Sequence, residues 1–241
     1  MANRPHLIYP TMPLPPAVAA KVDGTAATPA LPRGTRRALQ ADAKEQRRHL
    51  ILDAAADVLT QAPNRDIGVA EVAQAAGLAK GTVYLYFPSK DELLLALHER
   101  QTEWFFRALA EASEQRRLDF EGVFALLDRY MLSDPLYLPL ASRCLGALDF
   151  SVLPAVRTAY KQRIAERLAH VGAILEAHFT GLEPGGGISL LMSSYAMIMG
   201  LWQLLSPDPA NPYPLDFRRD TEAALRALWR GRVVGWQEAG R

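Results

Sequence analysis

The chain has 241 residues, about half of them apolar, which is enough to bury a core in one large domain or two smaller ones. Its formal net charge is only +1, so the overall charge does not point to a nucleic-acid partner. A single cysteine, Cys144, excludes an internal disulfide framework and a cysteine-based metal cluster. The N-terminus has no charged start followed by an apolar run, so no signal peptide is expected and a reducing cytoplasm fits.

Residues 1–40 hold seven of the seventeen prolines and have no periodic apolar face. This composition predicts a disordered or extended tail. The end of the tail is basic and includes Arg33, Arg36 and Arg37. Two interpretations of these arginines remain open: a solvated linker, or an arm that lies along the backbone or the minor groove of DNA.

From Asp42 onward the apolar residues recur with a helical period, and Asp42 with Glu45 resembles a capping pair. Pro63 and Asn64 end this helix. Residues 68–87 predict two short helices joined at Gly77, because glycine takes the left-handed turn conformation at little cost. The small Ala73 and the branched Val83 would then pack the two helices together. Such a unit is a helix-turn-helix, which places its second helix in the major groove of DNA.

Pro88 ends the second helix of this unit, and Ser89 with Glu92 forms a capping box that opens a long helix to about Ser113. Further helical segments follow at about 119–132, 136–147, 152–179, 188–205 and 216–231, with a loop at 183–187. Strand-like alternation is absent from the sequence, so we expect an all-α protein. Its three parts are a tail (1–40), a helix-turn-helix domain (41–90) that would bind DNA, and a larger helical domain (91–241). The apolar run at 188–205 contains serines and a glutamine, which favours a buried helix over a membrane span.

The charges are unevenly distributed between these parts. Residues 33–90 carry nine Lys or Arg against six Asp or Glu, whereas residues 91–241 carry sixteen against nineteen. The positive part therefore coincides with the helix-turn-helix, as contact with phosphates requires.

The segment KGTVYLYFPSKDELL, preceded by the VAEVAQAAG helix and a capped amphipathic helix, resembles the DNA-binding domain of the TetR/AcrR family of bacterial transcriptional regulators. The resemblance covers about residues 44–97. It implies an all-α homodimer with an N-terminal three-helix helix-turn-helix domain and a larger helical domain for ligand binding and dimerisation. It further implies a repressor that binds a palindromic double-stranded DNA operator and is released by a small-molecule effector. No cofactor and no membrane partner are implied. A ligand-independent regulator or an activator remains the alternative.

The same resemblance assigns DNA-contacting roles to residues of the second helix and its surroundings. Lys80 would meet a phosphate or a guanine edge, Gly81 would let the backbone approach, and Thr82 would touch a base. Tyr84 and Tyr86 would donate hydroxyls to phosphates, with packing as the alternative role for one of them. Lys90 would help to hold a phosphate. Departures from the family pattern lie at Gly68, Ala79 and Leu85, where the family commonly has polar residues.

Large or polar residues on otherwise apolar helix faces are the candidates for a ligand pocket among the middle helices. They are Trp104, Phe105, Phe124, Tyr130, Arg143, Tyr160 and Tyr195, together with Tyr137, Cys144 and Met192. The cation of Arg143, within an otherwise apolar segment, needs an explanation. A ligand carboxylate, an internal salt bridge or an exposed position would each account for it. The five histidines lack metal-ligand spacing and there is no phosphate loop, so neither a metal site nor an enzyme is expected.

Overall fold

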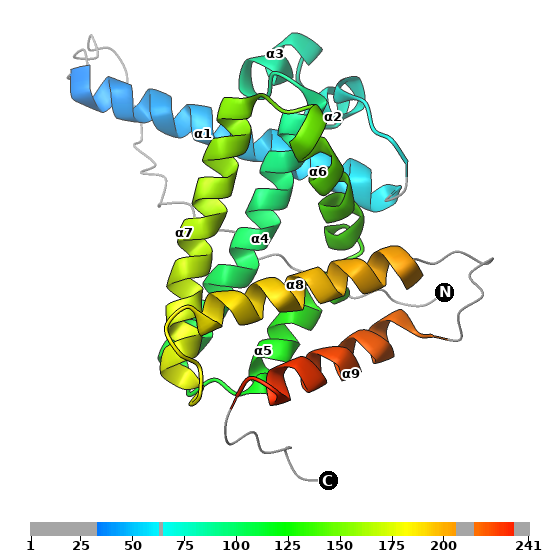
Figure 1. The fold of residues 1–241 in the computed structure, drawn as a ribbon. Coiled ribbons are helices and arrows are strands. Elements are labelled where there is room, and N and C mark those ends of the chain that lie inside the picture. Colours follow the sequence, from blue (N-terminus) through cyan, green and yellow to red (C-terminus); the bar gives the residue numbers. More distant parts are fainter. Residues whose placement is uncertain (1–32, 63–64, 206–214, 234–241) are drawn as a thin grey trace, which may run out of the picture. The chain divides into compact units, whose positions relative to one another are not determined.

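The computed structural model describes residues 33–62, 65–205 and 215–233, and within them the side chains of residues 41–62, 65–145, 151–205 and 215–233. Every regular element in these ranges is helical, which confirms the all-α prediction. The elements are α1 (Arg33–Gln61), α2 (Val69–Ala75), α3 (Lys80–Tyr86), α4 (Lys90–Gln115), α5 (Phe120–Leu127), the π-helical turn η1 (Asp128–Leu132), α6 (Tyr137–Phe150), α7 (Pro154–His178), α8 (Gly186–Leu205) and α9 (Phe217–Arg230) (Figure 1).

The helix that leads into the DNA-binding region begins earlier than the sequence predicts. α1 starts at Arg33, so residues 33–40 are helical and Asp42 lies inside the helix rather than at its cap. Arginine, alanine, leucine and glutamine, which fill most of this stretch, are all good helix formers. The predicted tail therefore reduces to residues 1–32, which lie outside the described residues.

The chain divides into two units, Met1–Asp42 and Ala43–Arg241. The helix packing described below lies within the second unit. Its buried side chains form two clusters. The first joins α1, α2 and α3 to the N-terminal part of α4, from Leu93 to Leu97, and to residues of α6 and α7. The second joins the C-terminal part of α4, from Phe105 to Leu109, to α5, α6, α7, α8 and α9. α4 therefore contributes buried side chains to both clusters.

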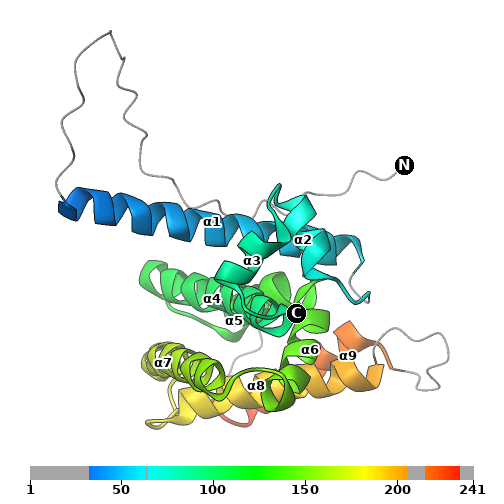
Figure 2. The same cartoon turned by 90° about the horizontal axis from the view of Figure 1, so that it is seen from above.

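α7 runs beside α4, and α8 lies beside both α7 and α9 (Figures 1 and 2). α7 and α8 approach closely where Gly172 faces Gly187. A Cβ built at Gly187 would lie 2.1 Å from the carbonyl oxygen of Gly172. Gly186 and Gly187, expected in a loop, are the first residues of α8. α8 has the length and composition of a membrane span, but Leu190, Leu191 and Ile198 are buried in the second cluster, as in a core helix.

Candidate DNA-binding surface and ligand cavity

The predicted helix-turn-helix is present. α2 and α3 are joined by a turn in which Gly77 has a φ of +65°, the left-handed conformation that the sequence predicts. Ala73 and Val83, 3% and 0% exposed, pack the two helices together, and Phe87 closes the end of α3. α3 is thereby fixed by residues on its inner face.

The outer face of α3 carries Lys80, Gly81, Tyr84 and Leu85, which recur at i, i+1, i+4 and i+5 and are all exposed. The ammonium of Lys80 lies 5.8 Å from the ring centre of Tyr84, so these two side chains lie against each other. A Cβ built at Gly81 would meet no atom within 4 Å, which leaves the backbone open to an approaching molecule. Leu85 is 81% exposed, so it adds an apolar side chain to this open face.

Thr82 and Tyr86 are half-buried, and the ring of Tyr86 packs against the first cluster. Of the two tyrosines, Tyr84 is therefore the one on the open face. Arg36 and Arg37 lie in the first turns of α1, among the residues whose side chains lie outside the described ones.

Around the start of α2, the basic side chains that could bind phosphate pair with nearby carboxylates instead. The ammonium of Lys90 lies 2.6 Å from Oδ1 of Asp66, and the hydrogen bond from Lys90 lowers the pKa of that carboxyl group. Gly68, where a hydroxyl residue is usual, donates its backbone N–H to Oε2 of Glu71 at 2.9 Å. Arg65 donates to the other oxygen of Glu71 at 2.7 Å. The carboxylate of Glu71 thus makes one of the two bonds of a capping box, and glycine at position 68 has no side chain to make the other.

A cavity of about 190 Å³ lies between α4, α6, α7, α8 and the turn η1. Each helix contributes one stripe of side chains at helical spacing. The lining residues are His98, Thr102, Phe105, Phe106, Leu127, Met131, Tyr137, Ala141, Cys144, Leu145, Tyr160, Ile164, Leu168, Leu191, Met192, Ser194 and Tyr195. Leu145 and Met192 are also 41% and 50% exposed, which places the mouth of the cavity between α6 and α8.

Phe105, Tyr160 and Tyr195 line this cavity, as the sequence predicts, together with Tyr137, Cys144 and Met192. The other four predicted ligand residues do not line it. The guanidinium of Arg100 lies over the ring of Trp104, and the ring of Phe124 stacks on Phe120. The guanidinium of Arg129 lies over the ring of Tyr130.

Arg143, another of the predicted ligand residues, lies outside the lining of this cavity. Its Nη2 donates to the backbone carbonyl of Arg65 at 3.1 Å, so it anchors the loop before α2 and does not point into the cavity. The carbonyl group of Arg65 is thus one acceptor of the Arg143 guanidinium.

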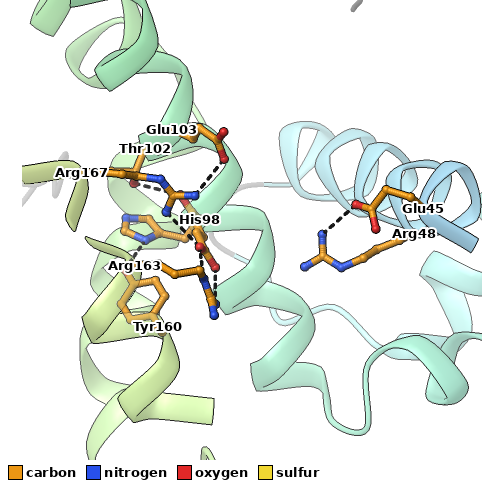
Figure 3. Close-up of polar contacts among 9 residues, drawn as sticks. Glu45, Arg48, His98, Thr102, Glu103, Tyr160, Arg163 and Arg167 are labelled. Carbon is orange, nitrogen blue, oxygen red and sulfur yellow. Dashed lines mark hydrogen bonds and ion pairs between the residues drawn. The ribbon is translucent and has the colours of Figure 1, made fainter. Parts of the chain in front are cut away.

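His98, which the sequence interpretation weighed only as a metal ligand, lies on the cavity wall (Figure 3). Its Nδ1 is 3.1 Å from the hydroxyl of Tyr160, and burial lowers its pKa to about 4, so the ring is neutral at pH 7. The i, i+4, i+7 spacing of His98, Thr102 and Phe105 is the signal that could have identified this face of α4. No group of three His, Cys, Asp or Glu side chains among the described residues could hold a metal ion.

A cluster of charged side chains ties α4 to α7 beside the cavity (Figure 3). Arg163 makes two hydrogen bonds to Glu99, at 2.5 and 2.7 Å. Arg167 bonds both Glu99 and Glu103, at 2.9 and 3.0 Å. Burial raises the pKa of Glu99, but the hydrogen bonds from the two arginines outweigh it, so the pKa lies below its usual value. The carboxylate is therefore charged at neutral pH and holds the two helices together.

Two sequence profiles match the chain over most of its length. That of the bacterial regulatory proteins of the tetR family matches residues 51–97, and that of a tetracyclin repressor-like C-terminal domain matches residues 99–234. The chain belongs to the TetR family. Because this is a family of transcriptional regulators, the expectation that the chain is not an enzyme is confirmed.

Characterised members of the TetR family match shorter stretches. The HTH-type transcriptional regulator EthR of Mycobacterium tuberculosis is 39% identical over 84 residues, 34% of this chain and 38% of that protein. The HTH-type transcriptional repressor KstR of Mycolicibacterium smegmatis is 30% identical over 146 residues, 58% of this chain and 65% of that protein. The chain thus matches less than two thirds of the length of either relative.

Solved structures extend the likeness of fold over the chain. SmeT, the repressor of the multidrug efflux pump SmeDEF of Stenotrophomonas maltophilia, superposes with a TM-score of 0.51 at 21% identity, covering 80% of this chain and 94% of that one. A TetR-family regulator from Mesorhizobium loti superposes with a TM-score of 0.53 at 18% identity, covering 79% of this chain and 98% of that one.

Proposed function

We propose that this protein is a sequence-specific DNA-binding transcriptional regulator, a homodimeric repressor that a small molecule releases from a palindromic operator. The observation that carries the proposal is the outer face of α3. Its four residues are exposed and include a cation, an aromatic hydroxyl group and an open glycine, while Val83 on the inner face is fully buried. A rigidly held helix with a basic, uncovered face fits the major groove.

Lys80, Gly81, Thr82 and Tyr84 are the proposed contact residues, with Tyr86 in a supporting role through its packing. Lys90 would join them only by exchanging Asp66 for a phosphate, because its ammonium is already paired. Arg36 and Arg37 are proposed to extend the contact along the DNA backbone.

The proposal of a homodimer rests on α8. Only about a third of the residues in the apolar part of this helix are buried within one chain, so side chains such as Leu204, which is 64% exposed, remain uncovered. A second copy packed on this face would cover these side chains and present two α3 helices to the two half-sites of one operator. A single recognition helix would read too few base pairs to be specific.

Ligand control would act through α4. Leu97 packs in the cluster that supports α3, and the next residue, His98, lines the cavity. Cys144 and Tyr160 also belong to both the cavity wall and that cluster. A ligand that prefers one placement of α4 would therefore change the affinity for DNA, typically by about 1–3 kcal/mol, or roughly 5–150-fold. The alternative is a ligand-independent regulator or an activator. We also propose that the protein acts in the cytoplasm.

The test begins with selection of bound duplexes from a random DNA library, which yields the operator sequence directly. Lys80→Ala and Tyr84→Ala should each weaken binding to that operator. Lys80→Ala should lower the slope of log affinity against log salt by about two units, because each of the two chains loses one phosphate contact. The matched control is Lys161→Ala, since Lys161 is an exposed helical lysine on α7. Equal effects at both lysines, or selection of no consensus sequence, would refute the proposal. Sedimentation of the complex gives the number of chains per operator.

A further inference from the structure

His98 is the one cavity-lining side chain, in the part of the chain that the structure describes, with a fully buried polar atom left without a hydrogen-bond partner. The residue is 4% exposed, and its Nε2 has no partner, while Nδ1 is engaged with the hydroxyl of Tyr160 (Figure 3). A buried, unpaired nitrogen costs free energy in the unliganded protein. A ligand hydroxyl group that reached this nitrogen would remove that cost.

Two other polar side chains of the cavity wall, Thr102 and Ser194, are already hydrogen-bonded. The hydroxyl of Thr102 donates to the backbone carbonyl of His98 at 2.9 Å. Ser194 donates to the carbonyl of Leu190 at 2.8 Å and accepts from the indole N–H of Trp229 at 3.0 Å. Burial raises the pKa of the Cys144 thiol to about 12, so it adds no charge. Among the described residues of the cavity wall, Nε2 of His98 is thus the fully buried polar atom without a partner, and Tyr195 brings a further hydroxyl group to the wall.

Among the described side chains, the lining contains no Asp, Glu, Lys or Arg. An ionised ligand would lose its hydration and find no opposite charge, which is strongly unfavourable. The enclosed volume, about 190 Å³, compares with roughly 150 Å³ for an engineered protein cavity that binds benzene. One substituted ring fits this space, and the mouth beside Leu145 and Met192 admits a longer substituent.

We propose that the effector is an uncharged, largely apolar molecule of about one ring, whose single hydroxyl group hydrogen-bonds to Nε2 of His98. A hydroxyl group suits the site because it both donates and accepts. If the hydroxyl of Tyr160 donates to Nδ1, Nε2 carries the proton and donates to the ligand. If Nδ1 carries the proton, Nε2 accepts. Phenols and cyclic alcohols have this chemistry, whereas carboxylates and amines do not.

This inference rests on the proposed function only in naming the cavity as the effector site, and it is tested without DNA. Calorimetry on the free protein would compare three probes that share a 4-methylphenyl group: 4-methylphenol, 1,4-dimethylbenzene and 4-methylbenzoate. We expect 4-methylphenol to bind about tenfold more tightly than 1,4-dimethylbenzene, as expected for one buried hydrogen bond, and 4-methylbenzoate not to bind.

His98→Phe keeps a ring in the wall and removes both nitrogens, so it should abolish the tenfold preference while 1,4-dimethylbenzene still binds. The comparison of the probes on the unmodified protein remains informative if that variant does not fold. Equal affinity for the two neutral probes, tighter binding of the benzoate, binding of none of the three, or a preference retained in His98→Phe would each overturn the inference. Failure of a bound phenol to release DNA would instead count against ligand control of the operator.

Discussion

Replacing Gly187 with alanine should destabilise the protein, because the new Cβ would lie 2.1 Å from the carbonyl oxygen and 2.8 Å from the Cα of Gly172. Both are backbone atoms, so the clash can be relieved only by moving α8 away from α7. Overpacking costs about 1–3 kcal/mol, and at such backbone distances the upper end is expected. The better helix propensity of alanine returns up to about 1 kcal/mol. The net loss is about 2 kcal/mol, or a fall in Tm of roughly 4–8 °C for a protein of this size.

Gly186 provides the matched control, because it precedes Gly187 in the same helix. A Cβ built there would make only ordinary contacts, at 3.6 Å, with the side chain of Leu182. Gly186→Ala should therefore leave stability unchanged or raise it by up to about 1 kcal/mol. Urea unfolding followed by circular dichroism gives both values. Similar unfolding free energies for the two variants would refute the close approach of α7 and α8.

Two further predictions concern His98 and Leu85. Between pH 6.5 and about 4 the unfolded protein binds a proton at His98 that the folded protein does not, because burial lowers the pKa of the folded side chain from 6.5 to about 4. Stability should thus fall as the pH is lowered from 7 to 5. Urea unfolding should show a smaller fall for His98→Gln, and an equal fall would contradict the assignment. On α3, the 81% exposed Leu85 should contact a thymine methyl group. Replacing that thymine with deoxyuridine should weaken operator binding by the unmodified protein about fourfold, as expected for one buried methyl group. The Leu85→Ser variant should bind the thymine and deoxyuridine operators equally well. Undiminished sensitivity of the variant would exclude the contact.

Helix boundaries could be predicted from the sequence where a residue fixes them locally. Pro88 ends α3, and the side chain of Ser89 accepts from the backbone N–H of Glu92 at 3.1 Å, as its spacing predicts. The predicted start of α1 at Asp42 was wrong, because Asp42 also fits inside a helix when good helix-forming residues precede it. A capping residue permits a helix to begin but does not require it.

Which side chains face the cavity could not be predicted from residue type. Trp104 and Phe105 are adjacent aromatics on α4, yet successive residues point about 100° apart around a helix, so only Phe105 lines the cavity. The rotation of α4 about its axis is set by packing against α7 and α6. The partner of Arg143, a carbonyl group 78 positions earlier in the chain, depends equally on which segments meet in space.

The placement of α4 limits how a ligand could act on DNA binding. Within two successive residues, Leu97 contributes to the core that supports α3 and His98 contributes to the cavity wall, so neither can shift without the other. One turn further along the same helix, Glu103 is held by Arg167 of α7, as is Glu99, which resists sliding of α4 along α7. Packed interiors switch between discrete arrangements and do not deform continuously. A molecule at His98 would therefore change operator affinity only by the difference in its own affinity for two placements of α4. One that bound both placements equally would occupy the cavity and leave the protein on its operator.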